Sequence, residues 1–200
     1  MKKKTSDLIE IINQGRVKEF VAYISAKGEI SEAVKRAVFK SKKSGIIKAY
    51  INGVFPAGSE FYKHQDLVAL YGDRKTLATY YLYHSLDEVG QIALIKRGDF
   101  SKFSYFVGRR PKLTKEAFAF LLAEGRPQLV KYYLENCLEQ AQINDLVASG
   151  NIRYIKYFTK VATPSELEAV ADATKRMEDC DVKSEISEIK VLKPYLFVLG

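Results

Sequence analysis

Residues 122–134 read LAEGRPQLVKYYL, and this pattern decides the fold because it recurs along the chain. Six segments align with it: INQGRVKEFVAYI (12–24), FKSKKSGIIKAYI (39–51), ALYGDRKTLATYY (69–81), IKRGDFSKFSYFV (95–107), LAEGRPQLVKYYL (122–134) and VASGNIRYIKYFT (147–159). The shared anchor position holds Gly15, Lys42, Gly72, Gly98, Gly125 and Gly150. Successive anchors are 27, 30, 26, 27 and 25 residues apart, a period that is typical of stacked supersecondary units.

Apolar residues flank every anchor at helical spacing. The third and fourth residues before each anchor are apolar, and so is the fifth residue after it. The eighth residue after each anchor is aromatic: Tyr23, Tyr50, Tyr80, Phe106, Tyr133 and Phe158. Spacing of i, i+3 and i+4 is typical of an amphipathic helix with one buried stripe. Each repeat therefore predicts two helices, with glycine between them because glycine enters the left-handed conformation without a steric cost.

The repeats predict an all-α fold, a right-handed stack of antiparallel helix pairs that forms one α-solenoid of about six to seven units. We expect a single domain over residues 1–200, with a basic tail at 1–4, six repeats over about 5–160 and a C-terminal cap over about 163–200. Thr114 and Thr163 are predicted N-caps, the latter followed by Pro164 and Glu166. Pro56 and Pro111 fall in joints between repeats, and the apolar end PYLFVLG is expected to pack back on the cap.

Two stretches carry a family resemblance. LTKEAFAFLLAEGRPQLVKYYLENC (113–137) and INDLVASGNIRYIKYF (143–158) resemble the two-helix body of an ankyrin repeat, and the resemblance extends more weakly over about residues 5–160. Ankyrin repeats are about 33 residues long and begin with a TPLH-type turn, which is absent here. The resemblance is therefore to a degenerate ankyrin-like array without hairpin fingers, and short HEAT-like helix pairs are the alternative.

Composition narrows the class of protein. The 200 residues are 47% apolar and 28% charged, as in an ordinary folded domain. No stretch approaches the roughly 18 to 20 apolar residues of a membrane-spanning helix, so no membrane insertion is expected. Asp7 and Glu10 interrupt what would otherwise resemble a signal peptide, and the two isolated cysteines fit a reducing, cytoplasmic setting.

Residues that could carry chemistry are few. His64 and His84 have no acidic or cysteine neighbour at metal-ligand spacing. Cys137 would act as a nucleophile only beside a base, and Asp179 and Asp181 are too few for a calcium or magnesium site. We therefore predict no catalytic residue, no cofactor and no metal, which makes an enzyme the less favoured class.

Positive charge is concentrated at the start of the chain. The first fifty residues hold twelve Lys or Arg and five Asp or Glu, which gives 12 − 5 = +7 of the total +8. The candidate partner-binding patch is Lys35, Arg36, Lys40, Lys42, Lys43 and Lys48. Helical spacing predicts that five of these, Lys48 excepted, share neighbouring faces of one helix. Such a patch suits nucleic acid, an anionic membrane surface or an acidic protein, and it equally suits a face that only keeps the protein in solution.

Tyrosines outside the anchored position leave two interpretations open, core packing and base-stacking platforms. They are Tyr81, Tyr83, Tyr132 and Tyr157.

Taken together, the sequence favours a non-enzymatic scaffold that binds a protein partner, because solenoids present long surfaces. Nucleic-acid binding through the basic N-terminal repeats is the alternative. A DNA-directed enzyme would need a carboxylate inside a basic groove. The identity of the partner and the oligomeric state stay open.

Overall fold

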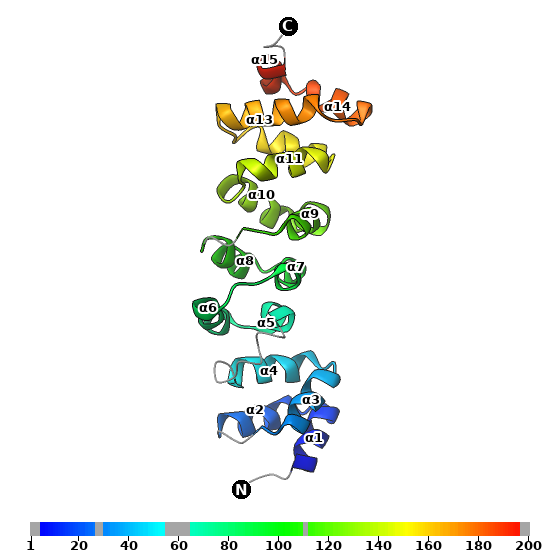
Figure 1. Cartoon of the computed structure of the whole chain (residues 1–200). Coiled ribbons are helices and arrows are strands. Elements are labelled where there is room, and N and C mark those ends of the chain that lie inside the picture. Colours follow the sequence, from blue (N-terminus) through cyan, green and yellow to red (C-terminus); the bar gives the residue numbers. More distant parts are fainter. Residues whose placement is uncertain (1–4, 27–29, 55–64, 110–111, 197–200) are drawn as a thin grey trace. The chain divides into compact units, whose positions relative to one another are not determined.

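The computed structural model describes residues 5–26, 30–54, 65–109 and 112–196. Within these residues the chain forms fifteen α-helices and one short 3-10 helix, and no strand (Figure 1). The prediction of an all-α protein is confirmed. Pro56 and Pro111 lie outside the described residues.

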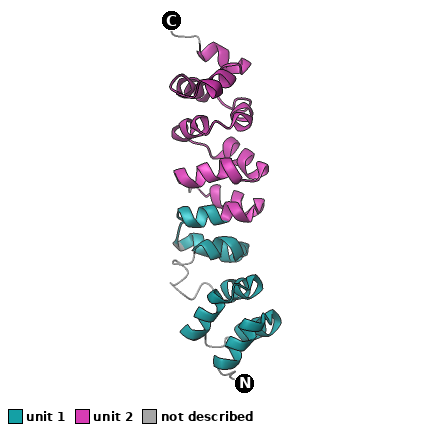
Figure 2. Cartoon of the chain, turned by 90° about the vertical axis from the view of Figure 1, so that its right-hand side faces the viewer, with its two compact units in different colours: residues 1–93 teal, residues 94–200 magenta. Residues whose placement is uncertain are grey.

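The chain divides into two compact units, Met1–Ala93 and Leu94–Gly200 (Figure 2). The boundary falls inside helix α7 (Glu88–Arg97). The expectation of one domain over residues 1–200 stays a prediction.

The first unit is built from helix pairs joined by tight turns. Its helices, apart from α7, are α1 (Thr5–Gln14), α2 (Val17–Ser25), α3 (Glu32–Lys40), α4 (Ser44–Val54), α5 (Gln65–Tyr71) and α6 (Arg74–Tyr83). Partners within a repeat pack together, as α1 with α2, α3 with α4 and α5 with α6. Equivalent helices of successive repeats also pack side by side, α1 with α3 and α2 with α4, and α4 in addition contacts α5.

The second unit shows the same rule over more repeats. Its helices are α8 (Phe100–Val107), α9 (Lys115–Glu124), α10 (Pro127–Asn136), α11 (Gln140–Ala148), α12 (Ile152–Phe158), α13 (Pro164–Lys175), α14 (Cys180–Ser187), η2 (Lys190–Leu192) and α15 (Lys193–Leu196). First helices pack in the order α9, α11, α13, and second helices in the order α8, α10, α12, α14. Two rows of neighbouring helices result, as a helical repeat requires.

The apolar positions of the repeat form the core. All six residues five places after the anchor are buried: Phe20, Ile47, Leu77, Phe103, Val130 and Ile155. The aromatic position is buried in five repeats, whereas Tyr23 in the first repeat is only half-buried. The doublets before the anchors are buried except for the half-buried Phe39. Five of the six anchored aromatics are therefore core residues, as the spacing predicted.

The anchors lie in the turns between paired helices, but glycine is required there for two different reasons. Gly15, Gly98 and Gly150 have φ of 72, 66 and 63°, the left-handed conformation that was predicted. The prediction is wrong for Gly125, whose φ is −68°, and for Gly72, which is not among the positive-φ residues. A Cβ atom there would lie 2.3 Å from the Leu121 carbonyl oxygen or 2.5 Å from that of Val68, so these turns exclude a side chain by close approach.

Side-chain caps start several helices. Thr114 and Thr163 accept hydrogen bonds from the backbone N–H groups of Ala117 and Glu166, which confirms both predicted N-caps. Pro164 is the first residue of α13, and Glu166 completes the capping box with Thr163. These caps satisfy donors that a helix leaves unpaired at its start.

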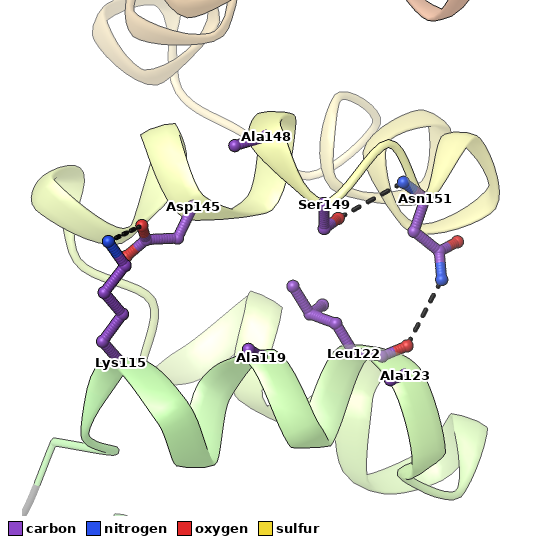
Figure 3. A pocket seen from close by; sticks show the side chains of 8 residues that line it. All are labelled: Lys115, Ala119, Leu122, Ala123, Asp145, Ala148, Ser149 and Asn151. Atoms are coloured by element: carbon purple, nitrogen blue, oxygen red, sulfur yellow. Dashed lines mark hydrogen bonds and ion pairs between the residues drawn. The ribbon is translucent and has the colours of Figure 1, made fainter.

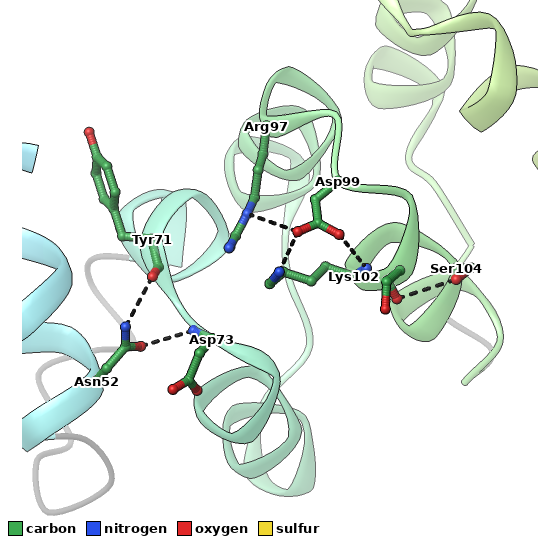
Figure 4. A network of polar contacts seen from close by, with 8 residues as sticks. Asn52, Tyr71, Asp73, Arg97, Asp99, Lys102 and Ser104 are labelled. Atoms are coloured by element: carbon green, nitrogen blue, oxygen red, sulfur yellow. Dashed lines mark hydrogen bonds and ion pairs between the residues drawn. The ribbon is translucent and has the colours of Figure 1, made fainter.

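Amide side chains tie neighbouring repeats together. In the first unit, Asn52 on α4 donates to the Tyr71 carbonyl at 3.3 Å and accepts from the Asp73 N–H at 2.9 Å, so it holds the turn between α5 and α6 (Figure 4). In the second unit, the buried Tyr133 hydroxyl donates to Gln142 at 3.0 Å and accepts from the Leu113 N–H at 3.2 Å. Burial raises the pKa of Tyr133, which keeps this hydroxyl protonated.

The C-terminal segment closes the second unit. Leu167 and Val170 of α13 are buried, and α13 packs against α14, η2 and α15. Leu192 of η2 is fully buried. Of the predicted apolar end PYLFVLG, residues 194–196 are described; they lie in α15, which contacts α13, and Tyr195 and Leu196 are half-buried. The last four residues, 197–200, lie outside the described residues.

Candidate interaction surfaces

The predicted basic patch lies around the turn that joins α3 to α4. Five of its six residues are exposed, and we call these five the basic turn surface: Arg36, Lys40, Lys42, Lys43 and Lys48. Lys40 is the last residue of α3, and Arg36 lies one helical turn before it. Lys42 and Lys43 form the turn itself, and Lys48 lies about one helical turn into α4.

The prediction that one helix carries Lys42 and Lys43 together with Lys35, Arg36 and Lys40 is wrong. Helix α3 ends at Lys40, and Ser41 caps it, because the chain must turn here to enter α4. Lys42 adopts φ of 53° and is the only described non-glycine residue in the left-handed region. Lys42 and Lys43 thus lie at the tip of the helix pair and not along the side of α3.

Lys35 differs from the other five residues. Its side chain is 21% exposed and forms an ion pair with Glu32 at 2.8 Å. This hydrogen bond with Lys35 lowers the pKa of Glu32, so the carboxylate stays charged and offsets the lysine. Lys35 therefore adds little to the charge presented at the turn.

The neighbouring turn in the first unit is electrostatically balanced. Arg16, which follows the anchor Gly15, pairs with Glu19 at 3.1 Å and with Glu10 at 3.7 Å. The two turns are close to each other, because a Cβ atom on Gly15 would lie 3.7 Å from Cδ of Lys43. Among the described residues, no member of the basic turn surface forms such an ion pair.

A second candidate surface runs across successive second helices of the second unit. Seven residues after the anchor, α8, α10 and α12 carry Tyr105, Tyr132 and Tyr157, all half-buried. We call these three residues the tyrosine row. Tyr132 and Tyr157 were singled out from the sequence, whereas Tyr105 was missed. The repeat alignment contained the signal for Tyr105, since it shares their position.

The tyrosine row is packed between helices. The Tyr132 ring meets Phe100 of α8 edge to face at 5.3 Å. The Tyr157 hydroxyl donates a hydrogen bond to Glu135 of α10, and this bond raises the pKa of Tyr157. Lys131 of α10 lies over the Tyr157 ring, 4.8 Å from its centre. Because neighbours occupy these rings, Tyr132 and Tyr157 serve helix packing more than base stacking. Tyr81 is half-buried, and nothing is described of the Tyr83 side chain.

A shallow groove of about 420 Å³ lies between α9 and α11 (Figure 3). Small side chains make it, since Ala119, Ala123 and Ala148 leave space between the two helices. Lys115 and Asp145 form an ion pair across one end at 3.7 Å. At the other end Asn151 donates to the Leu122 carbonyl at 3.3 Å. The polar groups that line the groove thus already have partners within the chain.

A second cavity of about 370 Å³ contains Cys137 together with Tyr132 and the Lys112–Glu139 ion pair. Burial raises the pKa of the half-buried Cys137 thiol, which disfavours the thiolate that a nucleophile requires. This cavity therefore offers no activated cysteine.

The other described candidates, His84 and Asp179, lie at the ends of helices. His84 is exposed at the end of α6, with its ring 5.2 Å from that of Tyr80, and His64 lies outside the described residues. Asp179 caps α14 by accepting from the N–H groups of Asp181 and Val182. In the described part of the chain, no group of three or more His, Cys, Asp or Glu side chains could hold a metal ion.

Comparison with models of known families, with curated proteins and with solved structures finds no match to this chain. In the described residues no helix is both long enough and apolar enough to cross a membrane. The surfaces described above are therefore interpreted from their own geometry.

Proposed function

We propose that this protein is a non-enzymatic helical-repeat scaffold that binds a protein partner. The supporting observation is the side-by-side packing of equivalent helices within each unit, which presents the same repeat position several times on neighbouring helices. In the second unit that position carries the tyrosine row, with Lys131, Gln128 and Arg153 exposed beside it. Tyrosine and arginine are enriched at protein interfaces.

Finer features belong to the same proposal. The repeats form an ankyrin-like α-solenoid without fingers, with six units over about residues 5–160 and a terminal cap. The protein acts in a reducing, cytoplasmic setting, which is consistent with two cysteines that are both free. Neither the ankyrin-like repeat nor the cytoplasmic setting requires a cofactor.

Purification of the tagged full chain from its source cells tests the proposal. The extract is treated with nuclease at about 0.15 M salt, captured proteins are identified by mass spectrometry, and each is purified and remixed with the chain. We expect one protein to rebind with a Kd of about 1 μM or below, as for a specific complex. If no captured protein rebinds, or if capture depends on nucleic acid, the scaffold function is wrong.

The second candidate function is nucleic-acid binding through the basic N-terminal repeats. The observation that favours it is the basic turn surface, none of whose five cations forms an ion pair with a described carboxylate. Such binding would weaken steeply with salt, because each phosphate contact releases counterions and contributes about 0.9 to the log–log slope. Titration of a short duplex at several salt concentrations measures that slope.

A further inference from the structure

We infer that the basic turn surface is a docking site for an acidic segment of a protein partner, that is, a stretch rich in Asp and Glu. This inference rests on the proposed scaffold function and deepens it, because it names the surface and the chemistry of the partner. The site is formed by Arg36, Lys40, Lys42, Lys43 and Lys48.

The charge of this surface is only weakly compensated by the described residues: Glu32 attracts Arg36, but no member of the surface forms an ion pair. No Asp or Glu occurs in the sequence between Glu32 and Glu60. Glu32 is already engaged by Lys35, whereas Arg16 at the adjacent turn has two carboxylates of its own. Five exposed cations within thirteen residues repel one another, and an anionic segment from a partner would relieve that repulsion.

Lys42 shows that the chain keeps a cation here at a cost to its own stability. Gly15, Gly98 and Gly150 occupy the equivalent left-handed position in other repeats, and Lys42 has the same conformation with φ of 53°. A side chain in this conformation is strained by its Cβ atom, and glycine is not. The lysine puts one more charge at the tip of the turn, next to Lys43.

Two observations favour a protein segment over nucleic acid. First, the positive charge is local, because residues 65–93 contain Arg74 and Lys75 but also Asp66, Asp73, Asp87 and Glu88. A protein–DNA interface covers at least about 600 Å² even for a single module. One turn with five cations suits a short segment better.

Second, in the part of the first unit that the structure describes, the aromatic rings of α3 and α4 are packed and not open to a base. Tyr50 of α4 is buried, and Phe39 of α3 is half-buried and packs edge to face on it at 5.7 Å.

The test measures binding of fluorescein-labelled decaglutamate to the full chain by fluorescence anisotropy, at several salt concentrations around 0.15 M. The patch variant carries R36Q, K40Q, K42Q, K43Q and K48Q. The matched control removes four lysines and one arginine, all exposed, from the second unit by K160Q, K175Q, R176Q, K190Q and K193Q. Circular dichroism and thermal unfolding establish that both variants are folded.

We expect the patch variant to bind decaglutamate at least about tenfold more weakly than the wild-type chain, since five exposed ion pairs are removed. The affinity of the control for decaglutamate should stay within about threefold of the wild-type affinity, a change that corresponds to loss of less than one such pair. Two parallel titrations use decathymidylate, which has about the same charge, and vesicles containing anionic lipid. Both should bind the wild-type chain more weakly than decaglutamate.

Several results would overturn the inference. They are the absence of decaglutamate binding to the wild-type chain, an equal loss in the patch variant and the control, or tighter binding of decathymidylate or vesicles.

Capture from source cells with the patch variant separates this inference from the scaffold function. If the wild-type chain and the patch variant retain the same protein partner, the docking site is wrong and the scaffold function stands. If the wild-type chain retains no partner, the scaffold function is wrong whatever the peptide titration gives.

Discussion

Helices α2 and α4 of the first unit and helices α10 and α12 of the second unit occupy equivalent places in the repeat, but different residues separate them. On α4, Gly45, Ala49 and Gly53 share one face at four-residue intervals. A Cβ atom on Gly45 or Gly53 would lie 2.9 or 2.5 Å from side-chain atoms of Val17 or Ile24 on α2. On α12, Tyr157 fills the corresponding space beside Glu135 and Lys131.

The difference shows that one repeat position sets how adjacent helices meet. Seven residues after the anchor, the first two repeats carry Ala22 and Ala49, and the last three carry tyrosines. Small residues let the backbone of one helix approach side chains of the next. Tyrosines instead place a ring, and its hydroxyl, between the helices. The two units therefore use the same repeat with different packing.

The largest expected effect comes from the aromatic position, where the first repeat of the first unit differs from the repeats of the second unit. We expect Tyr133→Ala and Phe106→Ala in the second unit each to cost about 3–5 kcal/mol of unfolding free energy, because a large cavity forms. Tyr23→Ala at the same position of the first repeat should cost less, about 1–2 kcal/mol, because Tyr23 is only half-buried. Urea unfolding followed by circular dichroism measures both. Equal costs at Tyr23 and Tyr133 would contradict the burial difference.

A residue exchange tests the packing comparison directly. Ala49→Tyr places the residue of the second unit where α2 and α4 pack closely, and we expect a loss of about 1–3 kcal/mol from overpacking. The reciprocal change, Tyr132→Ala, removes the edge-to-face contact with Phe100 and should cost at least about 1 kcal/mol. Chemical unfolding of both variants provides the measurement. Tolerance of tyrosine at position 49 would show that the small residues are not needed for the approach.

Exchanging lysine and glycine at the anchor position should change the stability of the protein in opposite directions in the two units. Lys42→Gly should stabilise the protein by about 1 kcal/mol, because it removes the strain of a left-handed side chain. Gly150→Lys should destabilise it by about the same amount, since Gly150 has φ of 63°. Melting temperatures of the two variants report the signs. A less stable Lys42→Gly variant would mean that the lysine side chain makes a stabilising contact.

The smallest effect concerns the helix starts and their dependence on pH. Asp99 caps α8 in the second unit, whereas Arg16 at the start of α2 provides no side-chain cap. A hydrogen bond from Lys102 holds the pKa of Asp99 below its usual 3.8 (Figure 4). Because the folded pKa is lowered, the ionised carboxylate stabilises the fold above about pH 4, and this contribution is lost as the pH falls through the lowered pKa.

Asp99→Asn keeps a capping side chain but removes the titration. The wild-type chain should therefore lose up to about 1 kcal/mol relative to this variant between pH 6 and acid below the lowered pKa. Urea midpoints of the two proteins across that range give the difference. A constant difference at all pH values would show that the charge of Asp99 does not contribute.

Much of the fold could be predicted from the sequence because each position of the repeat recurs several times along the chain. The anchors, the buried doublets and the caps Thr114 and Thr163 all follow from spacing and local backbone chemistry. The same register contained the tyrosine row, although Tyr105 was recognised only when the helices were seen side by side. For the basic patch, the sequence supplied the residues but misplaced two of them, because the end of α3 at Lys40 depends on the turn conformation of Lys42.

The sequence by itself determined the helical class, the pairing of helices around each anchor and the uneven distribution of charge. Only the tertiary structure decided which cations are compensated, because ion pairs such as Arg16–Glu10 join residues on different elements. It also decided why positions 72 and 125 must be glycine, because carbonyl oxygens of the preceding helix leave no room there for a Cβ atom. Spacing reports which residues share a helix face, whereas close approach and charge compensation depend on what packs against that face.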